Sequence, residues 1–168
     1  MLNNIFNPKT IALIGASEEP KTVGSGIALN LLKSKKKIFF VNIKQKKIFK
    51  KKVYKSILEI KEKIDLAIIA VPGGVVSSIA LECVQKKVKG VIVISAGFSE
   101  NGNMEREKEL KDILDKANIP LVGPNCLGIV NTKNNLNASF APFIPKKGNI
   151  ALLSQSGAII DSIIDISR

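Results

Sequence analysis

The stretch that decides the fold reads Thr10-Ile-Ala-Leu-Ile-Gly15-Ala-Ser17 and resumes, after a short loop, as Val23-Gly24-Ser-Gly26-Ile-Ala-Leu-Asn-Leu-Leu32. An apolar run rich in β-branched residues ends at a glycine, and a helical pattern begins beyond the loop. This order of strand, turn and helix is typical of the first unit of a nucleotide-binding α/β domain. Because the N-terminus of a helix presents unpaired N–H groups and a positive dipole end, the stretch predicts a site for a phosphorylated ligand.

The same stretch does not meet the dinucleotide fingerprint G-x-G-x-x-G. Position 17 is Ser where the second glycine would stand, and Glu18-Glu-Pro-Lys-Thr22 lengthens the loop before Gly24 and Gly26. A generic phosphate-binding turn is therefore favoured over an NAD site. A structural turn that binds no ligand is the remaining alternative.

The composition is that of a folded domain and excludes several kinds of chemistry. The chain has 168 residues, of which 45% are hydrophobic, enough for one domain and the start of another. No apolar run has the length of a membrane span and no leader precedes the fold, so we expect a cytoplasmic protein that does not bind a membrane. Cys83 and Cys126 lack a metal-ligand spacing, so free thiols and no metal site are expected. Histidine, the commonest general base and zinc ligand, is absent.

The net charge of +12 is concentrated in one segment. Thirteen lysines lie between Lys33 and Lys63, against two acidic residues, Glu59 and Glu62. A solvated lysine surface is the favoured interpretation, and attraction of a polyanionic small ligand is the second. Nucleic-acid binding is disfavoured because the lysines have no interleaved arginines and few aromatic residues for base stacking.

The apolar pattern alternates along the chain between short strands and helices. Strands are predicted at 10–15, 38–43, 66–71, 91–94, 120–122 and 150–153, helices at 26–34, 75–86 and 103–118, and a turn with a short helix at 53–60. Near-continuous apolar strands separated by amphipathic helices predict a doubly wound parallel α/β sheet. Ligands bind beyond the carboxyl ends of the strands in such sheets, and small, polar or turn-forming residues follow five of the predicted strands.

The pattern weakens after residue 128 and then repeats its opening. We predict a first domain at 1–128, a linker or crossover at 129–147, and the start of a second α/β domain at 148–168, so we expect the chain to be part of a larger protein. Ser154-Gln155-Ser156-Gly157 follows the last predicted strand. It lacks the first glycine of a nucleophile elbow, and without a histidine hydrolase chemistry is disfavoured. Phosphate held by the serine hydroxyls and the helix N-terminus is the preferred interpretation.

Several blocks of sequence, taken together and in order, are characteristic. They are Phe6-Asn-Pro-Lys-Thr-Ile-Ala-Leu-Ile-Gly-Ala-Ser17, Val53-Tyr-Lys-Ser-Ile-Leu-Glu-Ile60, Asp65-Leu-Ala-Ile-Ile-Ala-Val-Pro72, Ile94-Ser-Ala-Gly-Phe-Ser-Glu100, Gly123-Pro-Asn-Cys-Leu-Gly128 and Leu153-Ser-Gln-Ser-Gly-Ala158. Over essentially its whole length the chain closely resembles the N-terminal part of the α subunit of ADP-forming acetyl-CoA synthetases, which are related to succinyl-CoA synthetases. The resemblance implies a Rossmann-like CoA-binding domain, followed by the first strand and helix of a second, flavodoxin-like α/β domain.

The resemblance also implies roles for particular residues. Gly15, Ala16 and Ser17 would hold a CoA phosphate, with Gly24 and Gly26 opening the helix behind them, and Lys44 would lie near the nucleotide end of CoA. Val71 and Pro72 would line the adenine or pantetheine path; Ser95, Ala96 and Gly97 the pantetheine arm; and Asn125, after Gly123 and Pro124, the thioester and acyl site. Ser154, Gln155, Ser156 and Gly157 would face the phosphoryl group carried by a histidine.

The implied reaction converts acyl-CoA, ADP and phosphate into carboxylate, ATP and CoA through acyl phosphate and phosphohistidine. The implied partners are a β subunit or fused ATP-grasp domain that binds Mg-ADP or Mg-ATP, and a small acyl substrate. Two features depart from the family: the chain has no histidine, and Ile43 replaces the usual proline of Asn-Pro-Lys before Lys44. The chain alone is therefore expected to be inactive. A CoA-sensing module of an acetyltransferase fusion is the main alternative, and an NAD-binding domain is disfavoured because Lys44 stands where an acidic ribose ligand would be.

Overall fold

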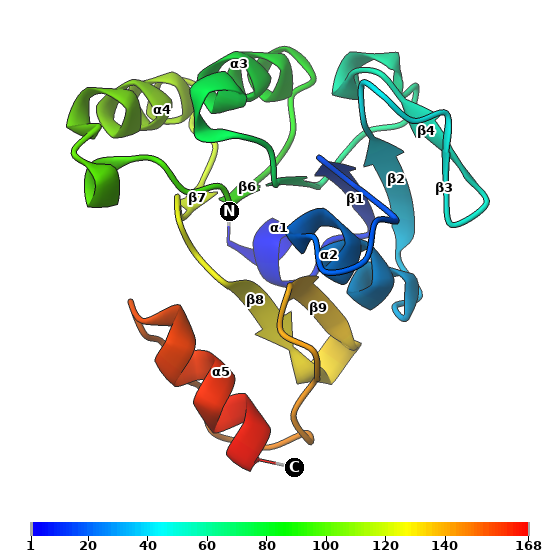
Figure 1. Ribbon diagram of the computed structural model, residues 1–168, viewed down its shortest axis with the longest axis vertical. Coiled ribbons are helices and arrows are strands. Elements are labelled where there is room, and N and C mark those ends of the chain that lie inside the picture. Colours follow the sequence, from blue (N-terminus) through cyan, green and yellow to red (C-terminus); the bar gives the residue numbers. More distant parts are fainter. Residues whose placement is uncertain (1, 168) are drawn as a thin grey trace.

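The computed structural model describes residues 2–167 as a seven-stranded sheet with helices on both faces (Figure 1). The strands are β1 (Thr10–Ile14), β2 (Lys37–Val41), β3 (Lys47–Ile48), β4 (Lys51–Tyr54), β5 (Leu66–Ile69), β6 (Val91–Val93) and β7 (Leu121–Val122), in the order β3-β4-β2-β1-β5-β6-β7. All pairs are parallel except β3 with β4. The chain winds outward from β1 in both directions, which confirms the doubly wound, Rossmann-like sheet.

The helices divide into two layers. They are α1 (Asn3–Phe6), α2 (Val23–Leu32), α3 (Val76–Gln85), α4 (Met104–Lys116) and α5 (Gly157–Ile166). Successive residues of a strand point to opposite faces, so Leu13 packs in the core that α1 and α2 cover, and Ile14 packs in the core that α3 and α4 cover. Both residues are almost fully buried, which explains why the strands are continuously apolar in sequence.

One edge of the sheet differs from the expectation. The segment Val53–Ile60, predicted as a turn and short helix, begins inside β4 and contains only a 3-10 turn, η1 (Ile57–Glu59). The short strands β3 and β4 form a lysine-rich hairpin in which Ile48 and Val53 are buried. A short, charged edge strand carries almost no apolar alternation, so the pattern could not indicate it.

A second hairpin occupies much of the segment expected to be a linker. Strands β8 (Gly128–Asn131) and β9 (Leu136–Ser139) pair antiparallel, joined through a 3-10 turn, η4 (Thr132–Asn134). Leu136 and Ala138 are fully buried in the same core as α2. The polar composition that resembles a linker belongs to a buried hydrogen-bond network: the Asn30 amide of α2 donates to Ser139 O at 3.0 Å and to Ala141 O at 2.7 Å. The domain boundaries themselves stay predictions.

Replacing Asn30 tests whether this network holds the hairpin. Asn30 is buried, so Asn30→Ala removes its amide bonds to Ser139 O and Ala141 O, and Ala141 O keeps only the bond from the Asn137 amide. The expected cost is about 2 kcal/mol in the free energy of unfolding. Urea titration followed by circular dichroism measures the change. Asn134→Ala removes a half-buried amide whose bonds to Phe6 O and Asn7 Oδ1 lie at the surface, and we expect a smaller loss of about 1 kcal/mol or less. Equal losses in the two variants would contradict the network's role.

The last part of the described chain is a helix without its predicted strand. Residues 150–153 form no strand, and Ile150 and Leu153 are 96% and 98% exposed. No strand among residues 2–167 pairs with this segment, so its backbone lacks the neighbour that a strand requires. Helix α5 does form and packs through Ile164 against Leu127 and Ala141, beside the β8–β9 hairpin (Figure 1). No helix within residues 2–167 has the length and apolar character needed to cross a membrane.

Candidate functional site

The turn after β1 is built by close contact between two glycines. Gly15 has φ +88°, and a Cβ there would lie 2.1 Å from Ala70 O. Gly24, in the first turn of α2, faces the turn so closely that a Cβ would lie 2.0 Å from Gly15 O. The absence of side chains therefore allows α2 to begin directly against the carboxyl end of β1, which is the arrangement that exposes helix N–H groups to a phosphate. Gly26 makes no such approach, since a Cβ there would lie 3.6 Å from its nearest neighbour, Phe140 Cβ.

The loop between β1 and α2 is held by its own side chains and by β2. Ser17 Oγ accepts from Glu19 N at 2.9 Å, and Thr22 caps α2 by accepting from Ser25 N at 3.3 Å. Asn42, just beyond β2, donates from its amide to Ala16 O at 2.8 Å. Its Oδ1 accepts from Lys44 N at 2.7 Å. Asn42 thus joins the predicted phosphate turn to Lys44, the predicted partner of the nucleotide end.

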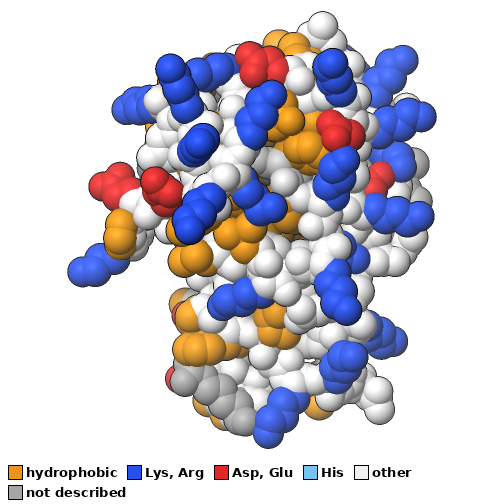
Figure 2. All heavy atoms as spheres, turned by 90° about the vertical axis from the view of Figure 1, so that its right-hand side faces the viewer, with side chains coloured by type: hydrophobic (Ala, Val, Ile, Leu, Met, Phe, Trp, Pro, Cys, Tyr) orange, Lys and Arg blue, Asp and Glu red, His pale blue; other side chains and the backbone are white. Residues whose placement is uncertain are grey.

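The lysine-rich hairpin lies beside the same loop. The Glu18 carboxylate accepts from Phe49 N at 2.9 Å, at the tip of β3–β4. Phe49 and Lys50 both have positive φ, as a two-residue hairpin turn requires. Figure 2 shows lysine side chains spread over this side of the molecule with few acidic ones. Lys44, Lys46, Lys47, Lys50, Lys51 and Lys52 are all exposed, so the hairpin surrounds the loop with mobile positive charge.

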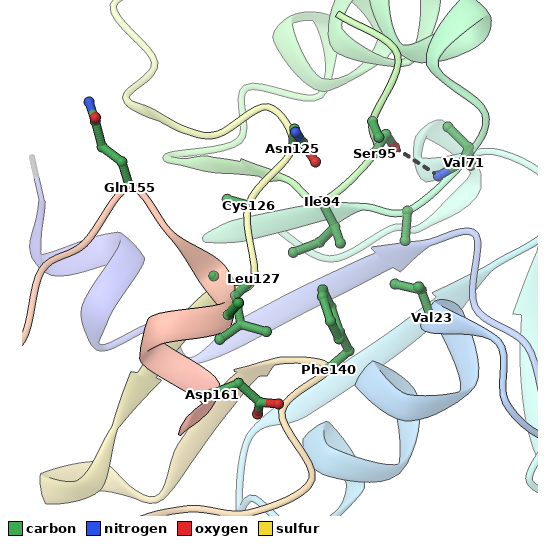
Figure 3. Close-up of a pocket in the computed structure, with 14 residues that line it drawn as sticks. Val23, Val71, Ile94, Ser95, Asn125, Cys126, Leu127, Phe140, Gln155 and Asp161 are labelled. Carbon is green, nitrogen blue, oxygen red and sulfur yellow. Dashed lines mark hydrogen bonds between the residues drawn. The ribbon is translucent and has the colours of Figure 1, made fainter. Parts of the chain in front are cut away.

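A cavity of about 640 Å³ opens at the carboxyl ends of β5 and β6 (Figure 3). Its lining residues come from four parts of the chain: the sheet edge, the start of α2, the end of the β8–β9 hairpin, and α5 with the turn before it. They are Val23, Ala70, Val71, Ile94, Ser95, Ala96, Asn125, Cys126, Leu127, Phe140, Gln155, Gly157, Ala158 and Asp161. In Figure 3 the ring of Phe140 points toward Ile94, across the middle of this group.

The polar end of the cavity is fixed by hydrogen bonds between strand ends. Val71 N donates to Ser95 Oγ at 3.1 Å (dashed in Figure 3), and Asn125 N donates to Ser95 O at 2.9 Å. Asn125 is exposed and has φ +51°, a conformation that asparagine tolerates better than most residues. Burial raises the pKa of the Cys126 thiol above its usual range, although backbone N–H groups oppose this. Cys126 is thus a neutral thiol that donates to Val93 O at 3.4 Å.

Hydrogen bonds to Glu100 and from Arg106 hold the turn after β6. The Glu100 carboxylate accepts from Gly97 N at 2.5 Å and from Phe98 N at 3.2 Å, and the backbone bond at Gly97 is the main reason that the Glu100 pKa lies below its usual range. Arg106 donates from its guanidinium to Gly97 O at 2.5 Å. These bonds fix the backbone of Ser95–Gly97, the segment predicted to line the pantetheine arm, at the sheet edge before any ligand binds.

The Ser154–Gly157 turn begins α5 at the cavity. Ser156 is the N-cap and accepts from Ile159 N at 3.4 Å, and Ser154 Oγ accepts from Ser156 N at 3.0 Å. A Cβ on Gly157 would lie 3.6 Å from Leu127 Cβ. Both serine hydroxyls therefore support the turn itself, and the first N–H groups of α5 remain as donors for an anion.

The structure brings together only part of the predicted site. Val71, Ser95, Ala96, Asn125, Gln155 and Gly157 line one cavity. The other predicted residues lie outside that lining. Those that form or flank the β1–α2 turn are Gly15, Ala16, Ser17, Gly24, Gly26 and Lys44, and those at other turns are Pro72, Gly97, Ser154 and Ser156. The predicted set of site residues did not include the lining residues Val23, Ala70, Ile94, Cys126, Leu127, Phe140, Ala158 and Asp161. Phe140 and Asp161 belong to no phosphate-binding motif, and only their position after β9 and in α5 assigns them to the cavity.

Comparison with known proteins identifies relatives over this whole region. Residues 9–132 match the family model described as CoA binding domain. An acetate–CoA ligase (ADP-forming) of Methanocaldococcus jannaschii is 48% identical over 166 residues, which cover 99% of this chain and 24% of that protein. The α subunit of acetate–CoA ligase (ADP-forming) II of Pyrococcus furiosus is 46% identical, over 98% of this chain and 36% of the subunit.

A solved structure has the same fold. Acetyl-coenzyme A synthetase 1 of Ca. Korarchaeum cryptofilum, in complex with phosphate and ADP, superimposes with a TM-score of 0.94 at 35% identity, covering 99% of this chain and 36% of that one. The chain thus spans between 24% and 36% of the length of these relatives. The motifs that predicted the family, the sheet topology and the matched residues agree, and the chain belongs to the CoA binding domain family.

Proposed function

We propose that this chain binds coenzyme A along the carboxyl edge of its sheet, as the CoA-binding part of an ADP-forming acyl-CoA synthetase. One observation carries the proposal: a glycine-built phosphate turn and a cavity at the ends of β5 and β6 lie along a single edge. CoA is a long ligand with an anionic nucleotide end and a narrow pantetheine arm. It therefore needs this combination of helix N-terminus, nearby cations and extended groove.

In the proposed binding mode the phosphates lie at Gly15–Ser17 and the N-terminus of α2. Lys44 and neighbouring hairpin lysines compensate the charge of the nucleotide end. The pantetheine arm then passes Val71 and Pro72 and follows Ser95, Ala96 and Gly97, so that the thiol reaches Asn125 at the cavity. Ser95 supports this path because its hydroxyl and carbonyl fix Val71 and Asn125, which keeps the groove open before the ligand arrives.

The reaction of the whole protein is also part of the proposal. The relatives are ADP-forming acetate–CoA ligases, and we propose the same class of reaction, in which acyl-CoA, ADP and phosphate give carboxylate, ATP and CoA. The chain contains no histidine, so a phosphohistidine would be supplied by residues outside these 168. Mg-ADP would bind to an ATP-grasp domain or subunit. This chain's own residues would hold CoA, and Ser154–Gly157 would provide half of a phosphate cradle.

Calorimetric titration with CoA, dephospho-CoA and NAD tests the proposal. We expect saturable binding of CoA and none of NAD, since no acidic residue stands near Lys44 after β2 to hold a ribose. Saturable binding of NAD without binding of CoA would overturn the proposal. Equal affinity for CoA and dephospho-CoA would show that the lysines do not contact the 3′-phosphate.

Lys44→Gln isolates the contribution of one lysine. We expect it to weaken CoA binding about two- to fivefold while leaving dephospho-CoA binding unchanged, because an exposed charge pair contributes modestly. Lys35→Gln removes the same charge before β2 begins, at the opposite edge of the sheet, and should have no effect at moderate salt. Equal losses in both variants would assign the lysines to general steering and not to a specific contact.

A further inference from the structure

The cavity has two ends of different chemistry. The end formed by the strands carries Ser95 and Asn125, whereas Val23, Leu127 and Phe140 form an apolar middle. Helix α5 borders the other end, where the exposed Asp161 lines the cavity. In Figure 3 Asp161 and Ser95 lie on opposite sides of Phe140. A ligand that enters along the strand ends therefore meets the polar end first, then the apolar middle, and Asp161 last.

Asp161 is the one acidic side chain of this lining, which contains no lysine or arginine. Cys126 is the other titratable lining residue, and its pKa is raised, so it is uncharged. Asp161 is exposed, and no residue within 2–167 gives it a hydrogen bond or an ion pair. An uncompensated carboxylate at the end of an apolar cavity repels a second negative charge and accepts hydrogen bonds from hydroxyl or ammonium groups.

We propose that Asp161 is a specificity-determining residue that selects CoA thioesters of monocarboxylic acids, with an uncharged, hydroxylated or cationic chain, against those of dicarboxylic acids. The inference rests on the proposed function, because it requires the CoA thiol to end near Asn125. An acyl group on that sulfur extends past Leu127 and Phe140 toward α5. The free carboxylate of a dicarboxylic acyl group then approaches Asp161, and the two like charges weaken binding.

Stable thioether analogues of matched length test the selection in this chain. The probes are S-butyl-CoA, S-(3-aminopropyl)-CoA and S-(2-carboxyethyl)-CoA, which place a methyl, an ammonium or a carboxylate at the chain end. We expect the carboxylate analogue to bind about two- to fivefold more weakly than S-butyl-CoA, with the ammonium analogue at least equal to it. Asp161→Asn should remove the difference, and raising the salt concentration should reduce it in the original chain.

A second substitution on the same helix controls for net charge. Asp165→Asn makes the same charge change one turn further along α5, where the residue does not line the cavity, and the discrimination should persist. Unchanged discrimination in Asp161→Asn overturns the inference while leaving CoA binding intact. Failure of the original chain to bind CoA itself overturns the proposed function and the inference with it, so calorimetry distinguishes the two failures.

Discussion

Gly24→Ala is expected to lower the free energy of unfolding by about 3 kcal/mol, although alanine is the better helix former. The added Cβ would lie 2.0 Å from Gly15 O and 3.2 Å from Gly15 C. Both atoms are backbone, so no side chain can rotate away, and either α2 or the β1 turn must move. The contact also holds Gly15 near Ala70, so the strain extends to the end of β5.

Gly26→Ala is the matched control, because it makes the same chemical change at the next but one residue of α2. Its Cβ would meet Phe140 at 3.6 Å, an ordinary van der Waals distance. With no clash to offset it, the higher helix propensity should raise the free energy of unfolding by about 0.5–1 kcal/mol. Urea unfolding of both variants measures the two signs. If Gly24→Ala also stabilised the chain, the close packing of α2 on the turn would be refuted.

The expected opposite signs reflect a difference in packing between the two glycines that the sequence could not distinguish. Both stand in the opening motif, and the sequence assigned both to the start of a helix. The difference lies in where a Cβ on each residue would point. At Gly24 it would point at the β1 turn, and at Gly26 it would point at Phe140, just after the β8–β9 hairpin. A sequence motif specifies only residue types and their spacing. The distance between each glycine and its neighbour depends on how the helix is rotated about its axis against the sheet.

The parts of the fold that the sequence predicted well are those with many apolar residues in a regular period. Strands β1, β5 and β6 are buried on both faces, and the helices α3 and α4 carry apolar stripes that match the 3.6-residue period. The hairpins β3–β4 and β8–β9 were missed because contacts with residues distant in sequence stabilise them, and these contacts leave no local apolar pattern. Lys47 and Lys51 are charged edge residues, and Asn30 pairs with Ser139 across 109 positions of sequence.

The candidate site also consists of a part that the sequence predicted and a part that it did not. Residues at strand ends, such as Ser95 and Asn125, could be predicted because a parallel sheet brings its carboxyl ends to one edge. Phe140 and Asp161 could not, because they follow a hairpin and lie within a helix whose position depends on packing around Ile164. Local motifs therefore predicted the polar end of the cavity, and tertiary packing determined its apolar middle and its charged end.

Ser17→Asp is expected to weaken CoA binding on the order of a hundredfold or more, because it places a carboxylate within a few ångströms of the proposed phosphate position. The fold should tolerate the change. Ser17 Oγ accepts from Glu19 N at 2.9 Å, and a carboxylate can accept the same bond. A negative charge near the N-terminus of α2 is also favourable for the helix dipole. The CoA affinity should therefore fall while the free energy of unfolding stays near its original value.

The control places the same charge at the other end of the helix. Ser34 follows α2, at the opposite edge of the sheet from the β1 turn, so Ser34→Asp alters net charge equally without approaching the phosphates. Calorimetry should give near-original CoA affinity for Ser34→Asp and no measurable affinity for Ser17→Asp. The urea midpoint should be no lower for Ser17→Asp than for Ser34→Asp, which places its charge at the unfavourable end of the helix dipole and loses the bond from Ser34 Oγ to Leu31 O. Because the carboxylate would occupy the charge position that the turn and helix provide for a phosphate, CoA cannot bind there without expelling it. Retained CoA affinity in Ser17→Asp would place the phosphates elsewhere along the sheet edge and remove the β1 turn from the site.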